Sequence, residues 1–338
     1  MKTLNILLTA ASRRVALVQA FRQALRSTGV AGSVIVTDVN PLSPAVHVAD
    51  RAYRVPMASD PEYLPEIMGI CEEERIGLLV PTIDDELPII GAARDRLHEA
   101  GTLVACSSEA TSALCNDKHA TCRHLAALGI PVAESWLPAD LPAAPRLPLF
   151  IKPRTGRGAV SAFPVRSARE LAFFLDYVPD PVVQEYLDGA EYTIDVLCDF
   201  AGRPLSIVPR ERVVIRAGVI DRGRTVADRR LIELAERVCA TVEFAGPLNI
   251  QCRMRGEQPV IFEINPRFSG GIPLTIQAGA DFPRMLLRLA MGRPVEPAVG
   301  AFRDGLWMTS FESSFFLDGP DGGMRGLGRL PQVVDEVA

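Results

Sequence analysis

The first hundred residues alternate short apolar runs with segments of helical spacing, and this rhythm constrains the fold more than any other feature. The apolar runs expected to be strands are residues 6–8, 34–37, 78–80 and 103–106. The segments with helical spacing between them are residues 13–28, 61–75 and 85–100. Strand–helix–strand alternation of this kind builds a parallel sheet with helices on both faces. We therefore expect an α/β domain at the start of the chain.

A parallel sheet of this type can bind a dinucleotide, but the first turn argues against that use here. The turn reads Thr9-Ala10-Ala11-Ser12-Arg13-Arg14 and lacks the three glycines that let a pyrophosphate approach the backbone. Asp38 follows the second strand, where a ribose-binding acid would lie. Without the glycines, a turn or cap is the favoured role for Asp38.

Composition excludes several broad classes of protein. The chain has 338 residues, of which 48% are hydrophobic and 23% charged, and its net charge is −5. These values are typical of a globular protein of two or three domain-sized parts and argue against a nucleic-acid partner. No apolar run reaches the roughly 18–20 residues that span a bilayer, so we expect no membrane partner and a cytoplasmic location. The seven cysteines form no Cys-x-x-Cys pair and are expected to be buried, reduced thiols.

The character of the sequence changes between about residues 117 and 150. A predicted helix over 117–128 is followed by the proline-rich segment 138–148. Short strands are then expected at 149–152, 159–164, 181–186, 191–198, 205–208, 248–254 and 260–264, with a helix at 228–242. Short strands with hairpin character predict an α+β region built on antiparallel pairing.

The strongest chemical constellation comprises Gln251, Glu263, Asn265 and Arg267 on two neighbouring predicted strands. Glu263 and Asn265 are two residues apart and therefore point to the same face of their strand. Carboxylate and amide oxygens are ligands that Mg²⁺ accepts, with phosphate and water completing its shell. Arg267 continues the alternation and could hold a carboxylate or a phosphoryl group with two hydrogen bonds. A solvated strand face is the alternative explanation.

Two further segments carry residues suited to a nucleotide. Lys152 ends an apolar strand and precedes a loop with Gly156 and Gly158, whose N–H groups could fold over phosphates. The loop does not have the Walker A sequence, and a simple hairpin turn remains the alternative. After the strand ending at Gln184-Glu185, the turn through Leu187 leads to Glu191. Such a hinge could offer backbone groups to an adenine edge and an acid to ribose.

In order and spacing these three elements resemble the ATP-grasp superfamily, and within it the carbamoyl-phosphate-synthase-like, carboxylate–amine ligase branch. Residues 81–87, 208–210 and 216–218 also resemble that branch. The resemblance extends to about residue 300. It implies an ATP-grasp fold of mixed α/β and α+β class. The implied parts are an N-terminal parallel-sheet domain (1–115), a small lid (116–187), an antiparallel Mg·ATP-binding domain (188–300) and a C-terminal extension of unknown role (301–338).

The resemblance also implies a role for each residue that matches a family position. The residues matched to ATP binding are Lys118 and Lys152 for phosphate, Gly156, Arg157 and Gly158 for the flexible loop, Gln184, Glu185 and Leu187 for the adenine hinge, and Glu191 for ribose. The metal ligands would be Gln251, Glu263 and Asn265. Arg267 would hold the acyl phosphate or its carboxylate precursor, and Arg210 would be a second transition-state cation.

The implied activity is ligation of a carboxylate to an amine, with an acyl phosphate intermediate and release of ADP and phosphate. The cofactors would be ATP and Mg²⁺, with Mn²⁺ as a substitute, and the partners small-molecule carboxylates and amines such as amino acids. Two alternatives remain open. One is a carboxylating or carbamoylating enzyme that uses bicarbonate, and the other is a nucleotide-binding module without turnover. A homodimer is an open alternative to a monomer.

Overall fold

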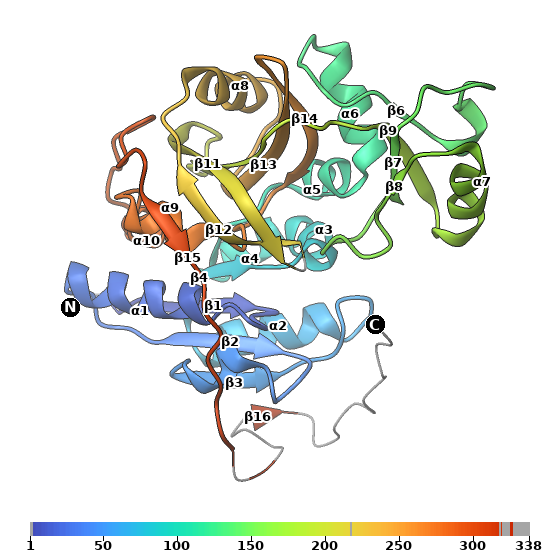
Figure 1. Cartoon of the computed structure of the whole chain (residues 1–338). Coiled ribbons are helices and arrows are strands. Elements are labelled where there is room, and N and C mark those ends of the chain that lie inside the picture. The colour runs from blue at the N-terminus through green and yellow to red at the C-terminus, as the bar shows by residue number, and fades with distance from the viewer. Residues whose placement is uncertain (1–2, 217, 318, 320–324, 327–338) are drawn as a thin grey trace. The chain divides into compact units, whose positions relative to one another are not determined.

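A computed structural model describes residues 3–216, 218–317, 319 and 325–326 (Figure 1). The chain divides into two compact units. Unit 1 comprises residues 1–105, 283–294 and 311–338, and unit 2 comprises residues 106–282 and 295–310. Unit 2 thus combines all of the predicted lid with most of the predicted ATP-binding domain. The predicted limits at residues 115, 187 and 300 stay predictions.

Unit 1 is built on a six-stranded sheet in the order β16-β3-β2-β1-β4-β5, in which every neighbouring pair is parallel. Its strands are β1 (Asn5–Thr9), β2 (Val34–Asp38), β3 (Arg51–Arg54), β4 (Ile76–Pro81), β5 (Leu103–Val104) and β16 (Arg325–Gly326). Its helices are α1 (Val15–Thr28), α2 (Tyr63–Glu73), α3 (Leu87–Ala92), α4 (Arg94–Glu99) and nearly all of α10 (Phe282–Ala290), with 3₁₀ turns η1 (Pro44–His47) and η2 (Asp84–Glu86). The predicted parallel sheet is confirmed.

Both faces of this sheet are covered, as expected. Ile6, Leu7 and Leu8 are consecutive on β1 and all fully buried, although neighbouring residues of a strand point to opposite faces. The carboxylate of Asp38 accepts hydrogen bonds from the backbone N–H of Ser12 at 2.6 Å and of Asn40 at 2.9 Å. This is the turn-stabilising role favoured for Asp38.

The helix predicted over 85–100 is instead η2, α3 and α4 in succession. Its beginning is set by Glu86, which is fully buried and accepts hydrogen bonds from the backbone N–H of Thr82 and Ile83 at 2.7 and 3.1 Å. The hydroxyl of Tyr63 also donates to Glu86. Glu86 thus caps the backbone at the start of this region, where the first turn is a 3₁₀ turn.

Unit 2 contains two antiparallel sheets. The smaller has the order β6-β9-β7-β8, and the larger has the order β14-β13-β10-β11-β12-β15. The strands are β6 (Ser135–Trp136), β7 (Leu149–Pro153), β8 (Phe163–Val165), β9 (Pro181–Glu185), β10 (Glu191–Cys198), β11 (Pro204–Arg216), β12 (Val219–Thr225), β13 (Gly246–Arg255), β14 (Gln258–Asn265) and β15 (Trp307–Thr309). The helices are α5 (Glu109–Asn116), α6 (Lys118–Ala127), α7 (Ala168–Tyr177), α8 (Arg229–Cys239) and α9 (Ile272–Gln277), with a 3₁₀ turn η3 (Pro138–Asp140).

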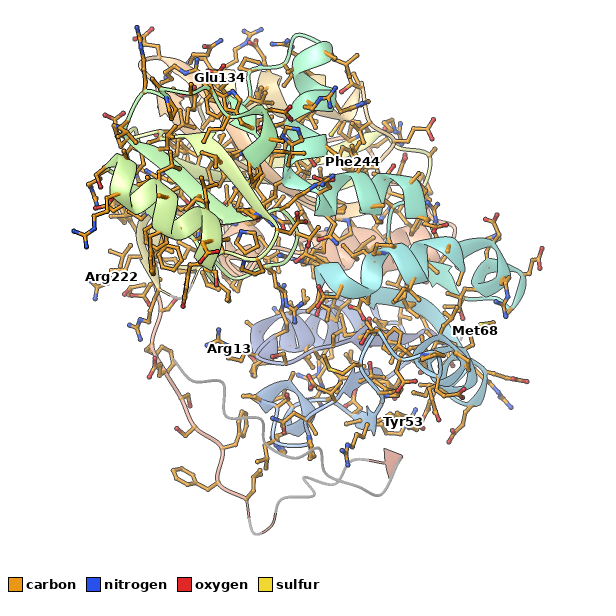
Figure 2. The ribbon with its side chains drawn as sticks, turned by 90° about the vertical axis from the view of Figure 1, so that its right-hand side faces the viewer. Arg13, Tyr53, Met68, Glu134, Arg222 and Phe244 are labelled. Carbon is orange, nitrogen blue, oxygen red and sulfur yellow. The ribbon has the colours of Figure 1, made fainter. Side chains whose placement is uncertain are left out.

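The larger sheet has one apolar face and one polar face. Ile194, Ile250 and Ile264 lie on the apolar face and pack against α8, whose own apolar residues recur at helical spacing. Phe244, which follows α8, belongs to the same core (Figure 2). Since side chains alternate along a strand, the residues between these apolar ones point to the opposite face. That opposite, polar face carries Glu191, Arg210 and the predicted metal ligands Gln251, Glu263 and Asn265.

The described part of the predicted C-terminal extension contributes two strands. β15 pairs with β12 in unit 2, and β16 pairs with β3 in unit 1. Residues 318, 320–324 and 327–338 of that extension lie outside the described residues. All seven cysteines are free thiols, and six of them are buried, as expected. Among the described residues, no helix has the length and apolar character needed to cross a membrane.

Candidate active site

The polar face of the larger sheet brings together residues from four strands. The strand register places Gln251 opposite Glu263 and Asn249 opposite Asn265. On its other side, β13 places Gln251 opposite Thr193 of β10. The predicted metal ligands are therefore neighbours, as the spacing of Glu263 and Asn265 indicated.

Lys152 and Glu263 form a buried ion pair at one end of this face. The two charged groups are 3.7 Å apart, with side-chain exposures of 7% and 18%. Lys152 also donates to the Phe262 carbonyl oxygen at 3.3 Å and lies over the Phe262 ring, 5.1 Å from its centre. Burial lowers the pKa of Lys152, which Glu263 opposes and the nearby Lys118 reinforces. An anion beside Lys152 would favour its charged form.

The amide groups beside Glu263 are held by hydrogen bonds. Asn265 Nδ2 donates to Glu263 Oε1 at 3.1 Å, and Asn265 Oδ1 accepts from Arg267 at 3.3 Å. The Gln251 amide oxygen accepts from Arg212 at 3.4 Å. For Asn265 to direct its oxygen toward the same cation as Glu263, its amide must turn by about 180°.

This donor set is suited to Mg²⁺ bound together with a phosphate. No group of three or more His, Cys, Asp or Glu side chains that could hold a metal occurs in the described part of the chain. The three predicted metal ligands supply one carboxylate, from Glu263, and two amide oxygens, from Gln251 and Asn265. Mg²⁺ is commonly held by one or two carboxylates, with substrate phosphates and waters as its other ligands. The residues present therefore fit a magnesium–nucleotide complex better than an isolated metal ion.

The Gly-rich loop is attached to the start of α6. The Arg154 guanidinium binds Asp117 Oδ2 through Nε at 2.9 Å and Nη2 at 2.6 Å. Lys118, which follows Asp117, donates a hydrogen bond from its backbone N–H to the Arg154 carbonyl at 3.0 Å. Its ammonium group donates another to the Gly156 carbonyl at 2.8 Å. Gly156 and Gly158 have φ of +96° and +74°, which side chains disfavour. The exposed Arg157 lies between them.

The predicted hinge residues direct their side chains to protein partners. Gln184 is buried and donates to the Cys122 sulfur at 3.4 Å. Glu185 accepts from Arg255 at 2.8 Å, and Leu187 is half-buried. With these side chains engaged, recognition of a base at the hinge would rely on backbone groups, and the hinge role stays a prediction.

The predicted ribose acid, Glu191, lies between two arginines. It accepts from Arg212 Nη1 at 2.6 Å and from Arg253 Nη2. The carboxylate is thus oriented within the polar face, and its contact with ribose stays a prediction.

The two predicted catalytic arginines differ in their surroundings. Arg267 is half-buried and donates to the Phe268 carbonyl at 3.0 Å. Arg210 is only 1% exposed and binds Asp195 through two nitrogens at 2.7 and 3.1 Å, and Ser269 at 2.8 Å. This burial favours support of the segment after Arg267 over contact with a substrate, so a catalytic role for Arg210 stays a prediction.

Sequence reasoning assigned no role to three members of the polar face: Asp195, Arg212 and Asn249. Each is two residues from a predicted site residue or from another member of the face. Glu191, Thr193 and Asp195 alternate with apolar or aromatic residues on β10, and Arg210 and Arg212 are two residues apart on β11 with Glu211 between them. Extending the alternation used for Glu263 and Asn265 to these strands would have found them.

Two family models match this chain. Residues 6–105 match the family described as PylC-like, N-terminal domain. Residues 177–313, which include most of the polar face, match the family described as ATP-grasp in the biosynthetic pathway with Ter operon. The chain thus carries an ATP-grasp domain within residues 177–313. The predicted resemblance is confirmed.

Curated relatives of this chain include carbamoyl phosphate synthase large chains. The carbamoyl phosphate synthase large chain of Deinococcus radiodurans is 26% identical over 319 residues, which cover 81% of this chain and 28% of the relative. This chain thus spans little more than a quarter of the length of these carbamoyl phosphate synthase large chains.

Solved structures share the fold at low identity. The biotin carboxylase domain of Hydrogenobacter thermophilus 2-oxoglutarate carboxylase, in complex with MgADP and bicarbonate, has a TM-score of 0.68 at 15% identity and covers 91% of this chain and 74% of that one. The L-amino acid ligase from Bacillus licheniformis has a TM-score of 0.66 at 19% identity. The match covers 90% of this chain and 78% of the ligase. The predicted ATP-grasp fold is confirmed.

Proposed function

We propose that this protein is a Mg·ATP-dependent ligase that joins a carboxylate to an amine through an acyl phosphate. The observation that carries the proposal is the polar face of the larger sheet. There the Glu263 carboxylate and two amides adjoin the buried ammonium of Lys152. A carboxylate with amide oxygens suits Mg²⁺, and a buried cation beside them suits phosphate oxygens.

The chain's own residues would bind and orient the nucleotide. Lys118 and Lys152 would contact the phosphates, and Glu263, Gln251 and Asn265 would hold Mg²⁺. The metal would neutralise phosphate oxygens and fix their orientation. Phosphoryl transfer needs little covalent help from a protein, so positioning and charge would account for most of the catalysis.

The reaction would proceed in two displacements. A carboxylate oxygen would bond to the γ-phosphorus of ATP as the bond from phosphorus to the β–γ bridging oxygen breaks, and ADP would leave with the electron pair. The amine nitrogen would then attack the acyl carbon, expel phosphate and lose a proton. Arg267 would hold the carboxylate or the acyl phosphate through paired N–H groups.

Water must be excluded because it would hydrolyse the acyl phosphate. The Gly-rich loop is suited to this task, since its glycines allow the backbone to approach phosphates closely. Its attachment to Asp117 and Lys118 would fix the position of the loop relative to the start of α6.

A second candidate is activation of bicarbonate as the carboxylate. It is favoured by two comparisons: the curated relatives are carbamoyl phosphate synthase large chains, and one structural neighbour was solved with bicarbonate. The first phosphoryl transfer would be the same, and only the acceptor would differ.

Release of ADP and phosphate from Mg·ATP would test both candidates. The protein is supplied with pooled amino acids and small carboxylates while bicarbonate is controlled. Release that requires a carboxylate and an amine together supports the ligase. Release with bicarbonate alone supports the second candidate, and Mg·ATP binding without any release would contradict both and favour a binding module.

Two matched variants identify the site in this assay. Glu263→Gln removes the proposed metal carboxylate and should abolish release. Glu257→Gln removes the same charge from the turn between β13 and β14, where the side chain is 96% exposed, and should leave release unchanged. Equal release by both variants would contradict the proposed metal site.

A further inference from the structure

Arg212 is a buried residue of the polar face to which the proposed function assigns no role. It lies on β11, and its side chain is 6% exposed. Nη1 donates to Glu191 at 2.6 Å and to Gln251 at 3.4 Å, and Nη2 donates to the Gly218 carbonyl oxygen at 2.7 Å. One guanidinium therefore joins two sheet residues to the turn between β11 and β12.

Two observations distinguish Arg212 from an ordinary ion-pair partner. Its Nε is buried and has no hydrogen-bond partner among the described residues, so the side chain is held by its Nη groups. Burial is the largest effect on its pKa and lowers it, against the opposing charge of Glu191. A guanidinium still keeps its charge in such surroundings, and its planar fork can bind two acceptors at once.

The turn that Arg212 holds lies directly against the Gly-rich loop. Gly218 has φ +72°, and a Cβ atom at this position would lie 3.0 Å from the Gly158 carbonyl carbon and 3.1 Å from its oxygen. Two backbone segments are thus in contact with no room for a side chain between them. Gly158 belongs to the loop whose other side is attached to Lys118 through Gly156.

We propose that Arg212 is a positioning residue that holds the β11–β12 turn against Gly158 and thereby fixes the Gly-rich loop. The loop is supported on two sides, by Lys118 at Gly156 and by Gly218 at Gly158. Because the same guanidinium binds Glu191, the loop and the predicted ribose acid share one support. The value of this support for catalysis rests on the proposed function, but the support itself does not.

Limited digestion of the full chain with trypsin tests the proposal without nucleotide. The exposed Arg157 offers a cleavage site within the loop, and cleavage there follows the population of the open loop when opening is fast. Arg212→Met should raise the rate of cleavage after Arg157 by about tenfold, the effect expected for loss of one charge-assisted hydrogen bond. Arg212→Lys should recover only part of this protection, because an ammonium lacks the planar fork.

A second arginine provides a matched control. Arg253 also binds Glu191, but its other contact is the Gly189 carbonyl, and it makes no hydrogen bond to Gly218 in the described structure. Arg253→Met should therefore leave cleavage after Arg157 within about twofold of the parent rate. Equal acceleration by Arg253→Met and Arg212→Met would overturn the proposal, because Glu191 alone would then explain the effect.

An independent variant tests the contact from the other side. Gly218→Ala leaves Arg212 intact and places a methyl group against Gly158, so it should also accelerate cleavage after Arg157. Cleavage after Arg230, in α8, reports general unfolding. Comparable acceleration at Arg230 would show that the effect is not local to the loop and would overturn the proposal.

Protection of the loop by Mg·ATP distinguishes the positioning role of Arg212 from the proposed nucleotide site. If Mg·ATP fails to protect the loop while the Arg212 effect persists, the nucleotide site is contradicted and the positioning role is supported.

Discussion

The buried ion pair between Asp195 and Arg210 leads to a quantitative prediction about the stability of unit 2. Both side chains are 1% exposed, and two hydrogen bonds of 2.7 and 3.1 Å join them. Thr275 also donates to Asp195, and Arg210 donates to Ser269 at 2.8 Å. Each charge thus depends on the other for compensation in a site from which water is excluded.

Removing one partner should cost far more than removing both. Asp195→Asn preserves the shape of the side chain but leaves the guanidinium buried without its counter-charge. Breaking a buried pair in this way costs about 3–5 kcal/mol of unfolding free energy. Arg210→Met should cost a similar amount because it leaves the Asp195 carboxylate uncompensated. In the double variant neither charge remains, so its loss should be well below the sum of the single losses.

Urea unfolding followed by tryptophan fluorescence measures these free energies. Both tryptophans of the chain, Trp136 and Trp307, lie in unit 2, so their emission reports that unit. Glu233→Gln, which breaks an exposed pair with Arg229, serves as the control and should change stability by less than about 0.5 kcal/mol. A loss below about 1 kcal/mol for Asp195→Asn, or single losses that simply add, would refute this reasoning.

Three further predictions concern other parts of the chain. Burial raises the pKa of Glu86, and the hydrogen bond from the Tyr63 hydroxyl partly offsets this rise by lowering the pKa. Folded protein therefore retains that proton to higher pH than unfolded protein, and this contribution to stability is lost as pH rises from the unfolded toward the folded pKa. Tyr63→Phe should extend the loss to higher pH, which melting temperatures by circular dichroism from about pH 4 to about pH 8 would measure. Gly271→Ala places a Cβ 2.3 Å from a guanidinium nitrogen of Arg210 and should lower the free energy of unfolding in urea by about 1–3 kcal/mol. Gly69→Ala, at a position of α2 with open space around it, should instead raise that free energy by about 0.5–1 kcal/mol. Lys152→Met should weaken Mg·ATP binding at least about tenfold by calorimetry, and Lys152→Arg should weaken it less.

Strands with a regular apolar face were predictable from the sequence. β10 was predicted over its full length, and the same face of Glu263 and Asn265 followed from their spacing. Ile264 lies in the core, as expected from the alternation. Phe262, the apolar residue before Glu263, is only half-buried, and its ring lies under Lys152.

Segments with a polar face were harder to recognise. β11 was predicted over 205–208 but extends to Arg216, because its second half carries charged residues on the polar face. α7 was missed although a signal was present. Ser167 accepts from the Glu170 backbone N–H, and Glu170 accepts from the Arg166 N–H, which resembles a capping box.

Ion-pair partners could not be predicted from local sequence. Glu191 binds Arg212 and Arg253, which are 21 and 62 residues away along the chain. Only the register of β10 against β11 and β13 brings them together. The side-chain directions of Gln184 and Glu185 likewise depend on Cys122 and Arg255, which belong to other elements.

Several cations lie on or beside the polar face, although the chain as a whole has a net negative charge. The sequence has a net charge of −5. The acids on this face that form ion pairs are Glu191, Asp195 and Glu263. The cations on or beside it are Lys118, Lys152, Arg210, Arg212, Arg253 and Arg267.

Two of these cations, Lys152 and Arg212, have buried side chains, and burial lowers the pKa of each although an acid lies beside it. Burying positive charge is costly, and a polyphosphate would supply further negative charge and raise the lowered pKa of Lys152. This cost supports a nucleotide site without depending on which residue contacts which phosphate.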